Sequence, residues 1–322
     1  NLANSMVFEN IITSNSTLTT STFDVIDNSL AYSFIANNDG SGGVDLIVNS
    51  TGLTTIENAV STKIKDVGRA LDNLNDGTVS TAFGGFTTET EVQEAVEQTL
   101  PTLAGDSSKA TFNSMQSVNN IVQARIEGTT GISSGDEIVE GHAWAKPFGS
   151  WAKQKDNNGN TGFSSDTYGM VIGSDKEINS TDRLGLAIAY ANSKTKSNSE
   201  LQESNIDIYQ GIVYGSKKLS DKLEVNFQSD ISLNKTNGAR TINFGGLNRT
   251  AISNYNSVGF HIGTGIKKVI NINSTLNFSA NTRLDYTYIK DNNYKEEGAG
   301  ALNLIVERNT NSKLIASSGI KA

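Results

Sequence analysis

The sequence predicts a mainly β fold, an antiparallel barrel of long strands that crosses a membrane. From about Gly141 to Ala322, large apolar residues alternate with small or polar ones, and turn-forming residues separate the segments. Because successive side chains of a strand point to opposite faces, each segment has one apolar and one polar wall. The segments span about 10 to 16 residues, whereas strands of globular sheets most often have about 5–6. Tyrosines fall near the expected strand ends, where an aromatic girdle would place them: Tyr190, Tyr214, Tyr286, Tyr288 and Tyr294.

The clearest alternation begins at Leu223. One parity is apolar: Leu223, Val225, Phe227, Ile231 and Leu233. The other parity is polar: Glu224, Asn226, Gln228, Asp230, Ser232 and Asn234. In a soluble sandwich the apolar walls would meet in a core, whereas in an outer-membrane barrel they face lipid and the polar walls line the lumen. Strand length and the tyrosine positions favour the barrel.

Composition excludes several classes of function. The net charge is −8 and no Lys/Arg cluster is present, which argues against nucleic acid as a partner. The absence of cysteine excludes disulfides and thiolate metal sites. The two histidines have no neighbouring His or Cys, which disfavours a metal site, and two histidines in the whole chain offer little for a catalytic triad. The glycine-rich run 39–43 lacks the Lys-Ser/Thr of a phosphate-binding loop and is expected to be a turn. No cofactor is expected. No apolar run reaches the roughly 18 residues of a transmembrane helix.

Residues 1–53 are expected to form short strands. Ser21–Val25, Leu30–Ile35 and Val44–Val48 are rich in β-forming residues. The turn Asn37-Asn38-Asp39-Gly40 joins the last two as a hairpin. Three short strands cannot bury a core alone. This segment is therefore expected to be the end of a larger domain.

Residues 54–139 change to a helical period. Apolar residues three or four apart predict one helix over 54–76: Ile56, Val60, Ile64, Val67, Leu71 and Leu74. A capping box at Thr54 and Glu57 would start it, and Asp76-Gly77 would stop it.

Two more helices are expected before the barrel. The first begins with a capping box at Thr88 and Glu91 and ends before Pro101. The second runs from about Ser107 to Glu127, with one apolar side formed by Phe112, Met115, Val118 and Val122. Glycines at 128, 131 and 135 then make a joint into the first barrel strand.

Residues 140–322 are expected to supply about nine strands. They lie near 141–154, 163–178, 182–195, 202–218, 222–236, 250–270, 274–290, 300–309 and 312–322. The joints fall at Asp156–Gly162, Asn179–Asp182, Leu219–Asp221, Asn271–Ser274 and Asn292–Gly298. Single-chain bacterial barrels have an even strand number, so nine indicates a miscount or an incomplete barrel.

Several motifs resemble one family, the type V autotransporters. Trp144-Ala-Lys-Pro-Phe-Gly-Ser-Trp151, followed by Gly162-Phe163, Tyr168-Gly169 and Gly173-Ser174-Asp175, resembles the opening of the translocator domain. Upstream, Gln98-Thr-Leu-Pro101, Asn113-Ser114 and Arg125 resemble the helical region before that barrel. The segments Phe23–Val25 and Val44–Leu46 resemble the junction that ends a β-helical passenger.

The resemblance implies a barrel of about twelve strands in the outer membrane of a Gram-negative bacterium. It also implies that a helix enters the barrel and that the upstream passenger reaches the cell surface through it. The implied partners are outer-membrane lipid, the chain's own passenger and the barrel-assembly machinery. The family ends in a strand with a terminal aromatic residue, whereas this sequence ends in Ile320-Lys321-Ala322, so the last strands are expected to be missing. An open edge in lipid leaves backbone groups unpaired.

The dipeptide Asn119-Asn120 resembles the cleavage site in the linker helix of the serine-protease autotransporters of enterobacteria. The resemblance implies that the Asn119 side chain cyclises onto its own carbonyl group and releases the passenger. That chemistry needs a desolvated asparagine activated by a carboxylate, and Glu224, Asp230 and Asp285 have the expected lumen parity. The alternative is that the dipeptide is merely part of a polar, solvent-exposed helix face. Apart from this single turnover, no enzymatic activity is expected.

The remaining polar residues with lumen parity are expected to line a hydrated pore and hold the helix: Glu224, Gln228, Asp230, His261, Lys267, Arg283 and Asp285. The sequence therefore predicts a translocator that anchors and exports a passenger. Two alternatives stay open. A porin-like barrel would have no helix in its lumen, and a soluble all-β adhesin module would bury the apolar walls.

Overall fold

The computed structural model describes residues 2–16, 25–26, 29–38, 40, 42–101, 103, 106–127, 142–157, 161–271 and 277–321. The chain divides into two compact units. The N-terminal unit comprises Asn1–Leu100, Thr241–Thr250 and Ala299–Leu302. The sheet unit comprises Pro101–Arg240, Ala251–Gly298 and Asn303–Ala322.

The N-terminal unit begins with a three-stranded antiparallel sheet. It contains β1 (Val7–Thr13), β2 (Tyr32–Asn38) and β3 (Gly43–Ser50) in the order β1-β3-β2. The predicted hairpin is therefore confirmed, and the central strand buries Val44 and Val48 completely. Most of the strand expected at Ser21–Val25 lies outside the described residues.

Four short helices follow: α1 (Ile56–Ala59), α2 (Lys65–Asp72), α3 (Gly77–Gly84) and α4 (Glu89–Gln98), with a 3-10 turn at Thr62–Ile64. The single helix expected over 54–76 is wrong, because the chain turns to extended backbone at Val60 (φ −117°, ψ 160°). Asp72 explains the break, since its carboxylate accepts the backbone N–H groups of Ile56 and Glu57 and so ties the start of α1 to the end of α2.

Helix capping differs in detail from the sequence pattern. The capping box of Thr88 and Glu91 is confirmed at the start of α4. The N-cap of α1 is Thr55 and not Thr54. The helix stop expected at Asp76-Gly77 is wrong. Asp76 begins α3 instead, because its side chain accepts the N–H of Thr78. The carboxylate also receives Arg249 Nη1 at 2.9 Å. This contact holds the pKa of Asp76 far below its usual value.

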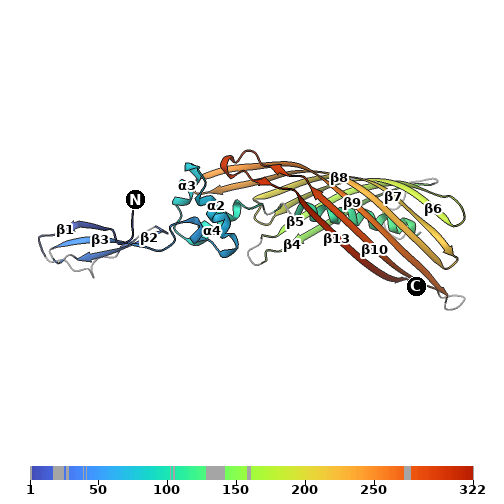
Figure 1. Cartoon of the computed structure of the whole chain (residues 1–322), viewed down its shortest axis with the longest axis horizontal. Helices are drawn as coiled ribbons and strands as arrows, with labels where there is room; N and C mark the ends of the chain where they lie inside the picture. The colour runs from blue at the N-terminus through green and yellow to red at the C-terminus, as the bar shows by residue number, and fades with distance from the viewer. Residues whose placement is uncertain are drawn as a thin grey trace. The chain divides into compact units, whose positions relative to one another are not determined.

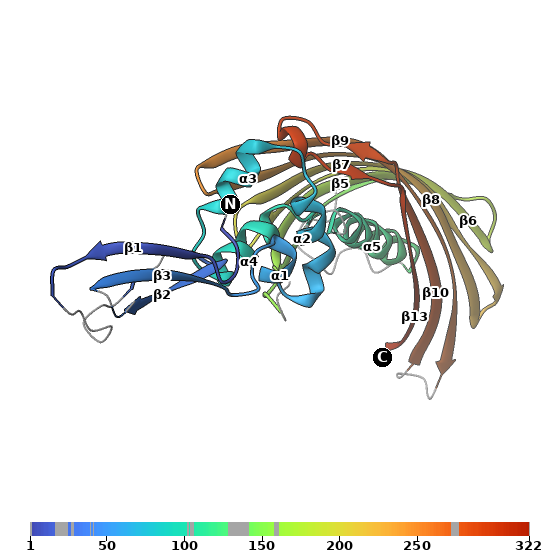
Figure 2. The ribbon, with the colours of Figure 1, turned by 60° about the vertical axis from the view of Figure 1, so that its left-hand side comes forward.

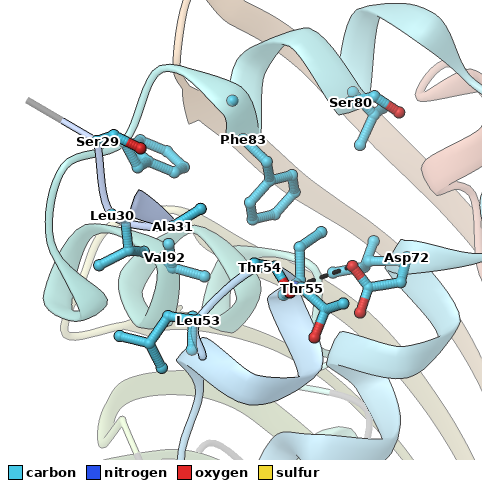
Figure 3. A pocket seen from close by; sticks show the side chains of 16 residues that line it. Ser29, Leu30, Ala31, Leu53, Thr54, Thr55, Asp72, Ser80, Phe83 and Val92 are labelled. Carbon is cyan, nitrogen blue, oxygen red and sulfur yellow. Dashed lines mark hydrogen bonds between the residues drawn. The ribbon is translucent and has the colours of Figure 1, made fainter. Parts of the chain in front are cut away.

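The helices and the segment before β2 enclose a cavity of about 280 Å³ in the N-terminal unit. Figure 3 shows Phe83 and Val92 facing it from α3 and α4, with Leu30 and Leu53 on the side of the loop segments. Asp72 lies at its margin. The lining is mostly apolar, so this cavity forms the incompletely filled core of a small helical bundle.

Among its described residues, the sheet unit contains one helix and an eight-stranded antiparallel sheet (Figure 1). The helix is α5 (Asp106–Ile126), as expected from the sequence. The strands are β4 (Ala143–Gln154), β5 (Phe163–Glu177), β6 (Asp182–Ser197), β7 (Gln202–Ser220), β8 (Leu223–Phe244), β9 (Leu247–Asn271), β10 (Asn277–Asp291) and β13 (Asn309–Lys321). Their order follows the chain, with β4 and β13 at the two edges. Figure 2 shows the sheet arching over α5.

The burial of the sheet is inside-out relative to a soluble protein. On β8, Phe227, Ile231 and Leu233 are 44%, 56% and 59% exposed, whereas the intervening Gln228 and Asp230 are 0% and 4% exposed. β6 repeats the pattern, with Leu186 and Ile188 exposed and Ala187 and Ala189 buried. A soluble sandwich buries its apolar face, so this arrangement contradicts the adhesin-module alternative and is that of an outer-membrane barrel.

Two expectations about the strands are wrong. The strand expected over 300–309 is absent from the sheet, because residues 300–308 contain a 3-10 turn (Gly300–Leu302) and β12 (Ile305–Val306), which pairs with β11 (Tyr294–Lys295), and Asn309 already begins β13. Gly298 and Gly300 have φ values of 98° and 64°, a conformation that interrupts a strand. The expected count of about nine is thus eight in the described part of the chain.

The β8–β9 hairpin is longer than predicted. β8 continues past residue 236 to Phe244, and β9 begins at Leu247 and not at 250. Gly245 and Gly246 make the turn with φ values of 53° and 81°, which glycine adopts without strain. The expected joints 156–162 and 271–274 lie partly outside the described residues, as does the joint after Glu127. Within the described ranges, no helix has both the length and the apolar character to cross a membrane.

Candidate functional site

α5 has an apolar side and a polar side, and each meets a different part of the sheet. Its apolar residues Val118, Ile121, Val122 and Ile126 form one cluster with inner-face side chains of β4 to β7. These partners are Trp144, Val171, Ala187, Ala189, Ile212 and Tyr214. The small alanines of β6 give the helix room to approach the sheet. Of the apolar side expected from sequence, Met115, Val118 and Val122 are buried and Phe112 is half-buried.

Polar contacts hold α5 along its length. Near its start, Ser108 Oγ donates to Asp291 Oδ2 on β10 at 2.9 Å. Near its end, Gln123 Nε2 donates to Gln228 Oε1 on β8 at 3.0 Å. Both partners are buried, so each contact replaces water that the side chains would otherwise need.

The last turn of α5 is fixed by an ion pair. Arg125 Nε lies 2.8 Å from Asp175 Oδ2 on β5, and the two side chains are 17% and 5% exposed. Asp175 Oδ2 also accepts Tyr214 Oη at 2.9 Å, and Tyr214 in turn receives Trp144 Nε1 at 2.8 Å. This chain of bonds joins α5 to β4, β5 and β7.

A cluster of buried charges lies beside the centre of α5. His261 Nδ1 is 2.7 Å from Asp230 Oδ2, and His261 Nε2 is 2.9 Å from Asp285 Oδ1. Arg283 Nη2 is 2.8 Å from Asp285 Oδ1, and its Nη1 donates to Asn226 Oδ1 at 2.7 Å. Each of these charged side chains is at most 11% exposed. Buried charges persist only when they are paired and hydrogen-bonded, as they are here.

Asn119 joins this cluster from the helix. Its Nδ2 donates to Asp285 Oδ1 at 3.1 Å, and its Oδ1 accepts Arg283 Nη2 at 3.4 Å. Asn119 is 3% exposed. The side-chain amide therefore faces a carboxylate in a water-poor place, which is the environment that asparagine cyclisation requires. The following residue, Asn120, is exposed and receives Gln116 Nε2 at 3.1 Å.

Glycines on β9 make room for the cluster. Gly263 lies opposite Asp285 in the β9–β10 register, and Gly265 lies opposite Arg283. A Cβ at Gly263 would collide with the Asp285 carboxylate and the Arg283 guanidinium. A side chain at this position is therefore incompatible with the observed ion pair.

The structure brings together five of the seven residues expected on the polar wall: Gln228, Asp230, His261, Arg283 and Asp285. It does not bring Glu224 or Lys267 to them. Those two residues line a separate hollow of about 180 Å³ with Ile126 and Glu127 at the end of α5.

Sequence reasoning missed several members of the site. Asn226 and Gln228 share the parity of Asp230, and that parity could have identified Asn226 as a partner. Gln210 donates to Asp230 Oδ1 at 2.7 Å from β7, and nothing local distinguishes it from other strand glutamines. Arg125 and Asp175 belong to two separate sequence motifs, and no local pattern predicts that they pair.

Comparison with known proteins agrees with this geometry. The family model described as "Autotransporter beta-domain" matches residues 143–322. An extracellular serine protease of Serratia marcescens is 24% identical over 245 residues, which are 75% of this chain and 23% of that protein. Outer membrane protein A of Rickettsia conorii is 28% identical over 280 residues, 79% of this chain and 14% of that protein. The chain thus spans less than a quarter of the length of these curated relatives.

The fold also resembles a solved structure, the translocator domain of autotransporter NalP from Neisseria meningitidis. The TM-score is 0.54 at 14% sequence identity, over 69% of this chain and 72% of that one. The family model covers more than half of the chain and matches the segment that forms the inside-out sheet. The chain therefore belongs to the autotransporter family, and its β-domain is an outer-membrane translocator of a Gram-negative bacterium.

Proposed function

We propose that this chain anchors its own passenger in the outer membrane and exports it to the cell surface by type V secretion. In this proposal residues 1–53 are the end of the passenger, residues 54–139 are the linker, and residues 140–322 are the translocator. The observation that carries the proposal is α5, which lies buried along the polar side of an inside-out sheet. A helix in that place disfavours an open porin-like channel.

The direction of α5 supports export towards the outside. Its first turn contacts Asp291 and Asn311, which flank the long connection between β10 and β13. Ile126, in its last turn, lines a hollow together with Asn179 and Asp182 at the short β5–β6 turn. Outer-membrane barrels have short periplasmic turns and longer extracellular loops, so the start of α5 belongs to the extracellular side. The passenger precedes α5 and is placed outside on this argument.

The test is protease access on intact cells. The full-length protein carrying an epitope tag upstream of residue 2 is produced in a Gram-negative host. Added protease should remove the tag from intact cells, while the strands stay in the outer-membrane fraction as a band whose gel mobility changes on boiling. A tag that is protected until the cells are lysed would contradict export. Loss of the band after depletion of the barrel-assembly machinery would support that machinery as a partner.

We further propose one turnover of self-cleavage between Asn119 and Asn120. In this step Asn119 Nδ2 attacks the carbonyl carbon of Asn119 while Asp285 accepts a proton from Nδ2. The new N–C bond closes a succinimide ring, the peptide C–N bond breaks, and the nitrogen of Asn120 leaves as an amine after taking up the proton that Asp285 accepted. Burial of Asn119 and its 3.1 Å contact with Asp285 support this assignment.

Mass spectrometry tests the cleavage. The wild-type protein should yield a barrel fragment that begins at Asn120 and an upstream fragment one water lighter than its free-acid form. Asn119→Ala should abolish both fragments. Asn113→Ala serves as the matched control, because Asn113 lies on the same helix and is exposed. Cleavage that persists in Asn119→Ala, or an intact wild-type protein in the outer membrane, would refute the assignment.

A further inference from the structure

His261 bridges the two carboxylates of the charge cluster. Its side chain is 4% exposed, and its two nitrogens lie 2.7 Å from Asp230 and 2.9 Å from Asp285. Asp230 is itself held by Gln210 Nε2 at 2.7 Å and by Gln228 Nε2 at 3.0 Å. Residues of β7 and β8 therefore fix the Nδ1 side of the ring through Asp230. On its Nε2 side, the ring fixes Asp285, the carboxylate that faces Asn119.

This arrangement places several donors on one oxygen. Asp285 Oδ1 receives Asn119 Nδ2, His261 Nε2 and Arg283 Nη2 at 3.1, 2.9 and 2.8 Å. Hydrogen bonds to an ionised carboxylate favour the ionised form and make it a weaker proton acceptor. While His261 donates to Asp285, the carboxylate is well placed beside Asn119 but poorly able to take its proton.

The site has two states, which differ in the number of protons on the His261 ring. A doubly protonated ring donates to both aspartates. A singly protonated ring that keeps its N–H towards Asp230 turns a lone pair towards Asp285. In that second state, a proton taken by Asp285 from Asn119 Nδ2 can pass on to His261 Nε2.

We propose that His261 is the positioning residue of the cleavage site and that loss of one proton from its ring switches Asp285 from a positioned but weak base to an effective one. The proposal rests on the cleavage function above. The charged groups that face the ring are Asp230 from β8 and Asp285, with Arg283 beyond it, from β10. α5 faces the site with Asn119, which is uncharged.

The test is the pH profile of cleavage in three variants. Unfolded full-length protein is refolded into detergent micelles between pH 5 and pH 9, and the fragment beginning at Asn120 is quantified by mass spectrometry. Each rate is normalised to the folded, heat-modifiable band of the same sample. The wild-type rate should rise with pH up to the end of this range, by at most about tenfold per pH unit, as one proton leaves the ring.

His261→Gln keeps an N–H group that can reach Asp285 but does not titrate in this range. Its rate should be flat across the range and at least about tenfold below the wild-type rate at pH 9. His142→Gln is the matched control, because it removes the chain's other histidine, which is exposed, and it should keep the wild-type profile. His261→Asn replaces His261→Gln if the latter gives no folded band.

The outcomes separate the two proposals. A wild-type protein that folds but stays intact overturns both. A wild-type protein that cleaves, together with a His261→Gln variant that has the same rising profile, overturns only the role of His261. A flat and slow variant profile beside a rising wild-type profile supports it.

Discussion

Replacing Arg125 with leucine tests how α5 is held in the sheet unit. The substitution removes one partner of a buried ion pair whose nitrogen and oxygen lie 2.8 Å apart. Losing one partner of such a pair costs about 3–5 kcal/mol, because the other charge stays buried without compensation. Asp175 keeps Tyr214 Oη at 2.9 Å and lies 3.9 Å from Arg183 Nε. These contacts offset part of the loss, so we expect a net destabilisation of about 2–4 kcal/mol.

The assay is urea unfolding in micelles, followed by the heat-modifiable band and by the fluorescence of Trp144, which is bonded to Tyr214 in the same chain of contacts. Linear extrapolation gives the free energy of unfolding for wild type, Arg125→Leu, Asp175→Leu and the double variant. We expect the double variant to lose less than the sum of the single variants, because it leaves no unpaired buried charge. A single variant as stable as wild type, or strict additivity, would refute the reasoning.

Three more predictions follow from the sheet and the N-terminal unit. Ile188→Lys should destabilise the folded barrel by about 2–4 kcal/mol in the same urea assay, because its exposed face meets lipid near the bilayer centre. Ser164→Lys, near the start of β5, should cost only about 0–1 kcal/mol. Gly263→Ala should destabilise the protein by about 1–3 kcal/mol and reduce cleavage, because the added Cβ collides with the Asp285–Arg283 pair. Gly211→Ala should be close to neutral, because a Cβ there meets nothing within 4 Å. The pKa of Asp76 is lowered by its bond to Arg249, so its ionised form stabilises the N-terminal unit above about pH 4, and that contribution is lost as pH falls towards the folded pKa. Helical circular dichroism of the wild type should therefore decline in acid, and Asp76→Asn, which keeps an N-cap side chain, should lack that part of the decline; identical acid profiles would contradict the assignment.

The alternation of β4 to β10 could be predicted because a period of two is a local property of the chain. Leu186 and Ile188 identify one face of β6 without any knowledge of its neighbours. The continuation of β8 beyond residue 236 could not be predicted in this way. There the outward residues Lys235, Asn237 and Asn243 are polar, so the segment resembles a loop although the strand continues.

The candidate site was predicted as a set of residues but not as an arrangement. Parity alone placed Asp230, His261 and Asp285 on one wall, and that parity agrees with their burial. The contact between Asn119 and Asp285 joins residues 166 positions apart, which no local pattern reports. Its formation depends on the depth of α5 in the sheet and on Gly263 opposite Asp285. The same dependence on tertiary contacts explains the break between α1 and α2, where Asp72 overrides a continuous apolar stripe.

The central claim is that the sheet turns its apolar wall to lipid and encloses α5 with its polar wall. The chain has no cysteine, so single cysteines for spin labelling can be introduced without background. Labels at Leu186, Ala187, Ile188 and Ala189 in lipid vesicles would be exposed in turn to oxygen, which partitions into lipid, and to a water-soluble nickel complex. We expect high oxygen access at Leu186 and Ile188 and low access at Ala187 and Ala189, which α5 covers. Water access at Leu186 and Ile188, or no alternation along β6, would contradict it.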